Sequence, residues 1–228
     1  SNCTWYLYNF RKELLNDLKE KGYKLILLSP YDKYYSKISK YFDHEKNLFL
    51  YRGSENPFFE IITIINLFIA YKKFRPDLVH HFTIKPCIYG GIISRFLGIK
   101  NTINHVTGIG PSFYSSRIKI KYLNKILKPF YKYAFNNKKN NIMNIFHNNS
   151  DKNTFIKKLI KKKENTQTIK GSGVDINYFK KEILFKLNEG TKLLFPARLI
   201  KEKGIIELIN ACNDLWKEDY KFTLNIAG

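Results

Sequence analysis

The sequence predicts an α/β protein in which short apolar strands alternate with helices and build a parallel sheet. Brief apolar runs recur along the chain, and longer segments with helical spacing of apolar residues separate them. Hydrophobic residues make up 44% of the 228 residues, which is enough for a packed core. Aromatic residues make up 16%, and this excludes a disordered chain. Because a helix between two strands makes those strands parallel, the alternation indicates a Rossmann-like sheet with helices on both faces.

Each predicted element has a local reason. An apolar stripe that Gly22 ends predicts the first helix, Pro57 suits the first turn of a helix, and Asp151 suits an N-cap. The strands are short, apolar and bounded by turn residues. In chain order we expect a helix at 6–21, strands at 23–28 and 47–51, a helix at 57–74, a strand at 77–82, a helix at 86–97, a strand at 102–107, a basic helix within 116–140, a strand at 141–146, a helix at 151–163, strands at 166–170 and 192–195, a helix at 204–217 and a strand at 221–226.

A pair of glycines marks the predicted domain boundary. Gly171 and Gly173 interrupt the alternation, and a second series of elements follows them. We therefore predict an N-terminal Rossmann-like lobe at 1–173, followed at 174–228 by a linker and the beginning of a second Rossmann-like lobe. A complete second lobe would need further strand–helix units, so we expect the chain to be a piece of a longer, two-lobed protein.

The positive charge is concentrated in one segment. The chain has 40 Lys and Arg against 19 Asp and Glu, a net charge of +21, yet residues 78–150 contain no acidic residue. Nucleic-acid binding is one interpretation, but no helix-turn-helix, RNP or zinc-finger pattern accompanies the charge. Lysines alternate with apolar and aromatic residues in the basic helix, which suits contact with anionic phospholipid headgroups. Lys121, Lys125 and Lys128 are the candidate membrane contacts, and a solvated Lys-rich helix is the alternative.

Cysteines and hydropathy exclude other classes of protein. Cys3, Cys87 and Cys212 lie far apart, without a histidine at metal-ligand spacing. We therefore expect neither a disulfide scaffold nor a zinc site, and we expect a reducing compartment. No apolar run reaches the length of a membrane span, and we expect no secretory signal.

The strongest local signal is a basic pair that follows the strand predicted at 192–195. Arg198 and Lys203 are five positions apart, and Gly204 begins the next helix. Two cations and the free N–H groups of a helix N-terminus would meet at the carboxyl end of a strand, where they can bind a phosphate. A basic turn in a Lys-rich chain is the alternative interpretation.

These residues resemble the R-x4-K-G donor-diphosphate motif of family 4 glycosyltransferases, which have the two-lobed GT-B fold. Gly173-Val174-Asp175 with Phe179 resembles the interlobe G-V-D-x3-F element of that family. A further set of motifs resembles the subgroup that builds capsule, O-antigen and bacterial N-glycan precursors on undecaprenyl diphosphate. That set consists of Asn9-Phe10-Arg11, Arg52 with Asn56-Pro57, Phe82-Thr83-Ile84-Lys85-Pro86 with Tyr89-Gly90, Val106-Thr107-Gly108-Ile109-Gly110, and Asn148 with Asp151.

The resemblance implies a donor site and a reaction. Arg198 and Lys203 would be the catalytic pair: they would hold the diphosphate of a nucleotide sugar and stabilise the leaving nucleotide without a metal. Gly204, Thr107 and Gly108 would complete the donor site. The anomeric configuration would be retained. The nucleotide sugar is a co-substrate, so the resemblance implies no cofactor.

The resemblance also implies an acceptor site in the N-terminal lobe. Lys85 at a helix start, His81 at the end of a strand and Gly110 in the glycine-rich loop are the candidate contacts for a lipid diphosphate or its sugar. We expect His105 to be a packed strand histidine, and we expect His80 to pack against the sheet.

The predicted function is therefore a retaining glycosyltransferase. It would transfer a hexose or N-acetylhexosamine, from a UDP sugar, to a polyprenyl-diphosphate-linked saccharide in the synthesis of a cell-surface polysaccharide or glycan. We expect a cytoplasmic protein, peripheral on the inner face of the membrane, that binds no nucleic acid. A sugar-nucleotide epimerase of GT-B fold and a non-catalytic nucleic-acid-binding module are the alternatives. The family's Glu-x7-Glu element, which binds the donor, would lie after Gly228, so we expect the chain alone to be inactive.

Overall fold

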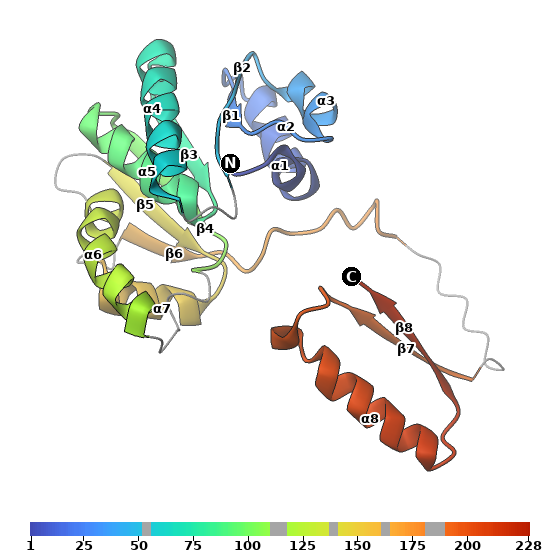
Figure 1. The fold of residues 1–228 in the computed structure, drawn as a ribbon. Helices are drawn as coiled ribbons and strands as arrows, with labels where there is room; N and C mark the ends of the chain where they lie inside the picture. The colour runs from blue at the N-terminus through green and yellow to red at the C-terminus, as the bar shows by residue number, and fades with distance from the viewer. Residues whose placement is uncertain (52–55, 110–117, 137–140, 161–164, 181–189) are drawn as a thin grey trace. The chain divides into compact units, whose positions relative to one another are not determined.

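The computed structural model describes residues 1–51, 56–109, 118–136, 141–160, 165–180 and 190–228. It divides into two units, Ser1–Asp175 and Ile176–Gly228, and the helices and strands of each are labelled in Figure 1. In both units every strand pairing is parallel, so the predicted α/β class with parallel sheets is confirmed.

Unit 1 contains most of the described elements. In chain order they are α1 (Thr4–Phe10), α2 (Lys12–Glu20), β1 (Ile26–Ser29), α3 (Tyr35–Ile38), η1 (Ser39–Tyr41), β2 (His44–Asn47), α4 (Pro57–Phe74), β3 (Leu78–Phe82), α5 (Ile84–Phe96), β4 (Asn101–Val106), α6 (Ile118–Phe135), β5 (Asn141–Phe146), α7 (Asn149–Lys158) and β6 (Thr166–Thr168).

The strands of unit 1 form two separate parallel sheets. β1 pairs with β2, and a four-stranded sheet has the order β3-β4-β5-β6. Its register places Phe82 opposite His105, and Val106 opposite Phe146. Because all four strands run in the same direction, their carboxyl ends meet at one edge, which is where ligands of open α/β sheets bind.

Apolar packing joins the helices to this sheet. Phe146 of β5, Phe135 of α6 and Phe155 of α7 are fully buried, and the ring of Phe155 lies 4.7 Å from that of Phe135 and 5.3 Å from that of Phe146. α5 packs against both α4 and α6, and Figure 1 shows these three helices along one side of the four-stranded sheet. A second cluster joins α1, α2 and β1 to Phe82 at the end of β3.

Three predicted elements were wrong in detail. The helix expected at 6–21 is two helices that meet at Arg11 (φ −133°, ψ 4°). The strand expected at 47–51 lies earlier, as β2, and Leu48 and Leu50 are buried just after it. The N-cap of α7 is Asn148, whose side-chain oxygen accepts a hydrogen bond from the Asp151 backbone N–H at 2.7 Å. The expected cap residue is therefore the third residue of the helix, and its carboxylate accepts a hydrogen bond from the Asn148 side-chain amide at 3.1 Å.

Unit 2 is a small α/β element. It comprises β7 (Thr191–Pro196), the turn η4 (Lys201–Lys203), α8 (Ile205–Lys217) and β8 (Phe222–Ala227). β7 and β8 are parallel neighbours in one sheet, and α8 connects them in the chain. Cys212 of α8 is buried, at 1% exposure. The ring of Trp216 stacks 5.1 Å from Phe222. This strand–helix–strand unit is the start of the second series that the sequence predicted.

No helix in the described ranges is both long enough and apolar enough to pass through a lipid bilayer.

Gly90 in α5 offers a test of how closely this helix lies on the sheet. A Cβ atom at Gly90 would be 2.3 Å from Nε2 of the buried His81. We therefore expect Gly90→Ala to lower the free energy of unfolding by about 1–3 kcal/mol, as overpacking of a core does. Urea unfolding measures the change. The control is Gly108→Ala, because a Cβ there meets nothing within 4 Å. Equal stability of the two variants would contradict the close packing of α5.

Candidate functional site

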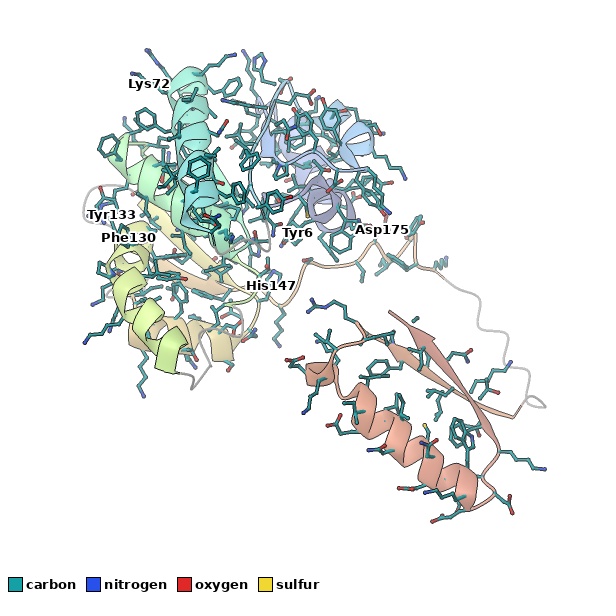
Figure 2. The ribbon with its side chains drawn as sticks, viewed as in Figure 1. Tyr6, Lys72, Phe130, Tyr133, His147 and Asp175 are labelled. Carbon is teal, nitrogen blue, oxygen red and sulfur yellow. The ribbon has the colours of Figure 1, made fainter. Side chains whose placement is uncertain are left out.

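Polar and aromatic side chains gather where β3, β4 and β5 end. Strand alternation places His80 and Phe82 on one face of the sheet, with a ring separation of 4.1 Å. The ring of His105 lies 5.5 Å from that of Phe82 and 5.0 Å from that of His147, which directly follows β5. Figure 2 labels Tyr6 and His147 at this edge of unit 1. The Arg–His cluster, as we call it, consists of Arg11, Tyr6, His80, Phe82, His105 and His147.

Arg11 is the centre of the cluster. It is buried, at 7% exposure, and lies where the chain turns between α1 and α2. Its Nε and Nη2 atoms donate to the Tyr6 hydroxyl at 3.1 and 2.6 Å. Nη2 also lies 3.3 Å from the Nε2 atoms of both His105 and His147. The guanidinium carbon is 5.1 Å from the centre of the Phe82 ring, a cation–π distance.

His105 and His147, two of the three histidines of the cluster, share one proton between their ring nitrogens. Their Nε2 atoms are 3.0 Å apart, so one imidazole donates and the other accepts. An Nε2 atom that accepts, from the other ring or from Arg11, is unprotonated, so the accepting ring is neutral. Burial and the charge of Arg11 lower the pKa of His105 to about 3. The same two causes lower the pKa of His147, and Asp151 opposes them.

The charge of Arg11 has no carboxylate partner among the described residues. Burial, the neighbouring histidines and Arg11 hold the pKa of His80 well below its usual value. The ring of His80 is therefore neutral and does not balance the charge of Arg11. A buried cation without an anion is costly. The cluster therefore has the electrostatic character of an anion site.

Several polar atoms near the cluster have unused hydrogen-bonding capacity. Within the described part of the chain, Nδ1 of His105, Nε2 of His80 and Oγ1 of Thr83 are buried without a hydrogen-bond partner. Thr83 also has a positive φ of 73°, which is strained for a threonine. Unsatisfied buried groups and backbone strain concentrate at binding sites. With Arg11, these groups can bind phosphate oxygens or sugar hydroxyls. No three His, Cys, Asp or Glu side chains in the described ranges come together as metal ligands.

The buried histidines make the folding stability of unit 1 depend on pH. Burial lowers the pKa of His81 to about 4 and is the largest cause of the lowered pKa of His105. In the unfolded chain both pKa values return to about 6.5, so below that pH the unfolded state binds more protons than the folded state. We expect stability to fall as the pH drops from about 6.5 towards 4, by up to about 1.4 kcal/mol per pH unit for each histidine. Urea unfolding at a series of pH values measures this. A smaller slope is expected for His105→Gln, and a flat profile would contradict the buried, neutral state of these rings.

His81 lies on the opposite face of the sheet from the Arg–His cluster. Its Nε2 atom is 2.7 Å from the Tyr71 hydroxyl and its Nδ1 atom is 2.8 Å from Oδ1 of Asn104. It is 4% exposed. Both ring nitrogens are therefore used inside the core, and the expected contact between His81 and an acceptor is corrected: this side chain joins α4 to β4. His105 is buried as expected, but it contacts Arg11 as well as the sheet.

Lys85 lies in the first turn of α5 and is partly buried. Its Nζ atom donates to the Tyr51 carbonyl at 3.0 Å and pairs with Glu60 at 2.6 Å. Because a carboxylate already binds this ammonium, an anionic acceptor would compete with Glu60 for it. The proposed acceptor role of Lys85 stays a prediction.

The loop after β4 holds the other predicted contacts of unit 1. Thr107 and Gly108 are half-buried, and Ile109 is buried in the core beside them. This packing fixes the loop next to the carboxyl edge of the sheet. Gly110 lies outside the described residues. The donor roles of Thr107 and Gly108 stay predictions.

In unit 2, the predicted catalytic pair follows β7. Arg198 and Lys203 are exposed, and neither forms an ion pair within the described residues. The chain between them is folded: the Lys203 N–H donates to the Ile200 carbonyl at 3.0 Å. Gly204 is the N-cap of α8, as predicted, with φ 77° and no side chain to cap the helix. No side chain caps the first-turn N–H groups of α8, which carries Glu207 in that turn, so these N–H groups can bind another acceptor.

The predicted membrane lysines lie on α6. Lys125 and Lys128 are exposed, whereas the side chain of Lys121 lies outside the described residues. Their contact with a membrane stays a prediction.

Sequence reasoning did not identify four members of the cluster as site residues. Tyr6 and His147 were not singled out, and Arg11 and Phe82 were noted only as parts of motifs. A usable signal was present, because three of the five histidines end or follow parallel strands whose carboxyl ends meet at one edge.

Known proteins resemble this chain in sequence and in fold. A curated relative, the N,N'-diacetylbacillosaminyl-diphospho-undecaprenol alpha-1,3-N-acetylgalactosaminyltransferase of Campylobacter jejuni, is 25% identical over 232 aligned positions, which cover 96% of this chain and 60% of the relative. The chain thus spans about 60% of the length of this relative.

Solved structures show the fold. A glycosyltransferase from Rickettsia africae is 19% identical, with a TM-score of 0.58 over 93% of this chain and 54% of that protein. A UDP-N-acetylglucosamine 2-epimerase from Rickettsia bellii is 18% identical, with a TM-score of 0.50 over 96% of this chain and 60% of the other. The predicted GT-B type of α/β fold is confirmed. Since a transferase and an epimerase both match, the fold alone does not separate these activities.

The family is decided by sequence. The model of the family described as "Glycosyl transferase 4-like" matches residues 3–148, which is more than half of the chain and includes every member of the Arg–His cluster. The resemblance to family 4 glycosyltransferases is confirmed, and the chain belongs to the Glycosyl transferase 4-like family.

Proposed function

We propose that this chain is part of a retaining glycosyltransferase that transfers a hexose or N-acetylhexosamine from a nucleotide sugar, most simply a UDP sugar, to a polyprenyl-diphosphate-linked saccharide. The observation that carries the proposal is the start of α8, where exposed Arg198 and Lys203 accompany a glycine N-cap. These groups suit a diphosphate. The Campylobacter relative, named as a transferase that acts on an undecaprenol-diphospho sugar, supports the acceptor class.

The chemistry would be electrostatic. The bond between the anomeric carbon and the diphosphate oxygen breaks, and the acceptor hydroxyl oxygen forms the new bond. Retention places both oxygens on the same face of the sugar, so the hydroxyl proton can pass to the departing diphosphate. Arg198 and Lys203 would neutralise the charge that develops on this leaving group, which requires no metal.

The Arg–His cluster is the proposed acceptor site of unit 1. Arg11 supplies an unpaired positive charge, and the unsatisfied atoms of His105 and Thr83 supply further polar contacts. A phosphate oxygen of the lipid-linked acceptor, or a hydroxyl of its sugar, fits this chemistry. The exposed Lys125 and Lys128 would hold the protein on the anionic, cytoplasmic face of the membrane, where such an acceptor lies.

Product analysis tests the proposal. The complete protein is incubated with a panel of nucleotide sugars and a polyprenyl-diphosphate saccharide, with and without a chelator. We expect mass spectrometry to show the acceptor enlarged by one sugar, with or without chelator, and NMR to show the donor's anomeric configuration in the product. Epimerised nucleotide sugar without an enlarged acceptor would contradict the proposal.

A further inference from the structure

Helix α4 carries more apolar surface than unit 1 buries. Its inner side packs in the core through Leu67, Ala70 and Tyr71, which are at most 4% exposed. On the outer side Ile61, Ile65 and Ile69 recur at four-residue spacing, and each is about half exposed. A helix in a globular protein normally has one apolar stripe and an opposite polar face. α4 therefore presents a second apolar stripe to its surroundings.

This stripe borders an open apolar groove between α4, α5 and α6. The groove has a volume of about 550 Å³. Among the described residues its lining is entirely apolar or aromatic and includes Ile65, Phe68, Phe96, Phe130 and Tyr133. Phe96 is 72% exposed and Phe130 is 53% exposed. Figure 2 shows Phe130 and Tyr133 on α6, and Lys72 at the far end of α4. Exposed apolar surface of this kind marks a binding face.

One end of the groove is fixed by Arg95. Its guanidinium lies 4.0 Å from the centre of the Tyr133 ring and donates to the carbonyls of Tyr133 and Asn136 at 2.9 and 2.8 Å. These contacts tie the end of α5 to the end of α6. They fix the two helices relative to each other at this end of the groove.

The surroundings of the groove are basic. Exposed lysines lie on α6 and at the end of α4, and they are Lys72, Lys73, Lys125, Lys128 and Lys132. The three helices contain one acidic residue, Glu60, which pairs with Lys85 at 2.6 Å. An occupant that matches this surface has an apolar part and negative charge beside it. An anionic phospholipid has both, with its acyl chain joined to a phosphate.

We propose that the α4–α5–α6 groove binds an acyl chain of an anionic membrane phospholipid, while the surrounding lysines contact the headgroups. The proposal rests on the membrane association in the proposed function and adds to it: unit 1 enters the apolar layer of the leaflet as well as touching its charged surface. Long lysine side chains suit this position, because their stems cover apolar surface while their ammonium groups reach the phosphates.

Vesicle sedimentation tests the groove against the charge. The complete protein is mixed with vesicles of phosphatidylcholine and phosphatidylglycerol. Two double variants are compared. The groove variant carries Ile65→Ser and Phe96→Ser, and the lysine variant carries Lys125→Glu and Lys128→Glu. We expect the groove variant to bind at least about tenfold more weakly, because two apolar side chains that would enter the lipid are replaced by polar ones. The lysine variant should lose binding mainly at low salt. Tyr23→Ser is the matched control, since Tyr23 is 60% exposed and lies outside the groove.

A depth measurement distinguishes insertion from headgroup contact. In a Phe130→Trp variant, lipids brominated on the acyl chain should quench the added fluorescence strongly, relative to the parent protein with its two tryptophans. Equal binding of the groove variant and the parent, or no additional quenching, would overturn the proposal. A dimer in solution that the groove variant abolishes would also overturn it, because the occupant would then be a second copy. Competition by polyprenyl phosphate but not by phosphatidylglycerol would assign the groove to the acceptor lipid instead.

The failure of this proposal is separable from the failure of the proposed function. Transfer to a short-chain acceptor in detergent needs no vesicle, so the groove variant should retain it. Groove-dependent vesicle binding without any transfer would leave the lipid proposal standing and remove the enzymatic one. Sugar transfer by a protein whose vesicle binding is unchanged in the groove variant would remove the lipid proposal and leave the enzymatic one standing.

Discussion

Lys203→Ala and Arg198→Ala are each expected to lower kcat/KM for sugar transfer by the complete protein about 100- to 1,000-fold, the usual cost of removing one preorganised group that stabilises developing charge. Both side chains are exposed, so their loss should change the free energy of unfolding by no more than about 0.5 kcal/mol. Steady-state transfer and urea unfolding measure the two effects.

Lys201→Ala is the matched control for this pair. Lys201 is also an exposed lysine and lies in the same turn, η4, two positions before Lys203. If positive charge near β7 were all that mattered, the Lys201 variant would lose as much activity as the Lys203 variant. Equal losses would contradict a specific diphosphate contact, and unchanged transfer by Lys203→Ala would remove it from the site.

Arg11→Met is expected to lower kcat/KM for the acceptor about 10- to 100-fold, because a hydrogen bond from a charged group contributes about 1.5–3 kcal/mol. Removing a buried charge is strongly destabilising when it leaves a charged partner behind, and Arg11 has no carboxylate partner among the described residues. We therefore expect loss of acceptor binding with a folded unit 1. Transfer to a short-chain acceptor, assayed at several acceptor concentrations, separates the two effects.

The titration of the histidines tests the same cluster independently of activity. The charge of Arg11 lowers the pKa values of His105 and His147, so both values should rise in Arg11→Met, as NMR can follow. Arg95→Met is the control, since Arg95 contacts Tyr133 and α6 rather than the histidines. Arg11→Met could instead destabilise the fold while the protein that remains folded keeps an unchanged kcat/KM for the acceptor. That result would mean that Arg11 only supports the fold.

The sequence predicted the elements whose signals are local. Pro57 begins α4 as its first residue, Gly204 caps α8, and the strands of the four-stranded sheet lie within a few residues of their expected positions. These features follow from backbone constraints and short apolar runs, which neighbouring residues determine.

The break at Arg11 has no local signal. The apolar stripe continues through it without a proline or glycine. Besides its hydrogen bonds to Tyr6 nearby in the chain, Arg11 contacts His105 and His147, which are 94 and 136 positions away. A tertiary contact therefore overrides the helical pattern. The cap of α7 was missed for a different reason: Asn148 and Asp151 are both good capping residues, and only the backbone shows which one precedes the helix.

The residues of the candidate site also include some with a local sequence signal and some without one. Arg198, Lys203 and Gly204 form a short contiguous motif, so the sequence could bring them together. His81 was misassigned because adjacent strand residues point to opposite faces, and the sequence does not say which face α5 covers. Gly90 shows the answer, because its missing side chain leaves space for the His81 ring. The sequence analysis predicted α4 as a helix but did not indicate which of its apolar residues stay exposed, and the structure shows that Ile61, Ile65 and Ile69 do.

Release of nucleoside diphosphate from a UDP sugar, measured with and without a polyprenyl-diphosphate saccharide, tests the central claim most directly. If Arg198 and Lys203 stabilise a diphosphate that leaves as the acceptor attacks, release should depend on the lipid-linked saccharide, match the enlarged acceptor mole for mole, and nearly vanish in Lys203→Ala. Release at the same rate without the acceptor, or undiminished in Lys203→Ala, would contradict the account.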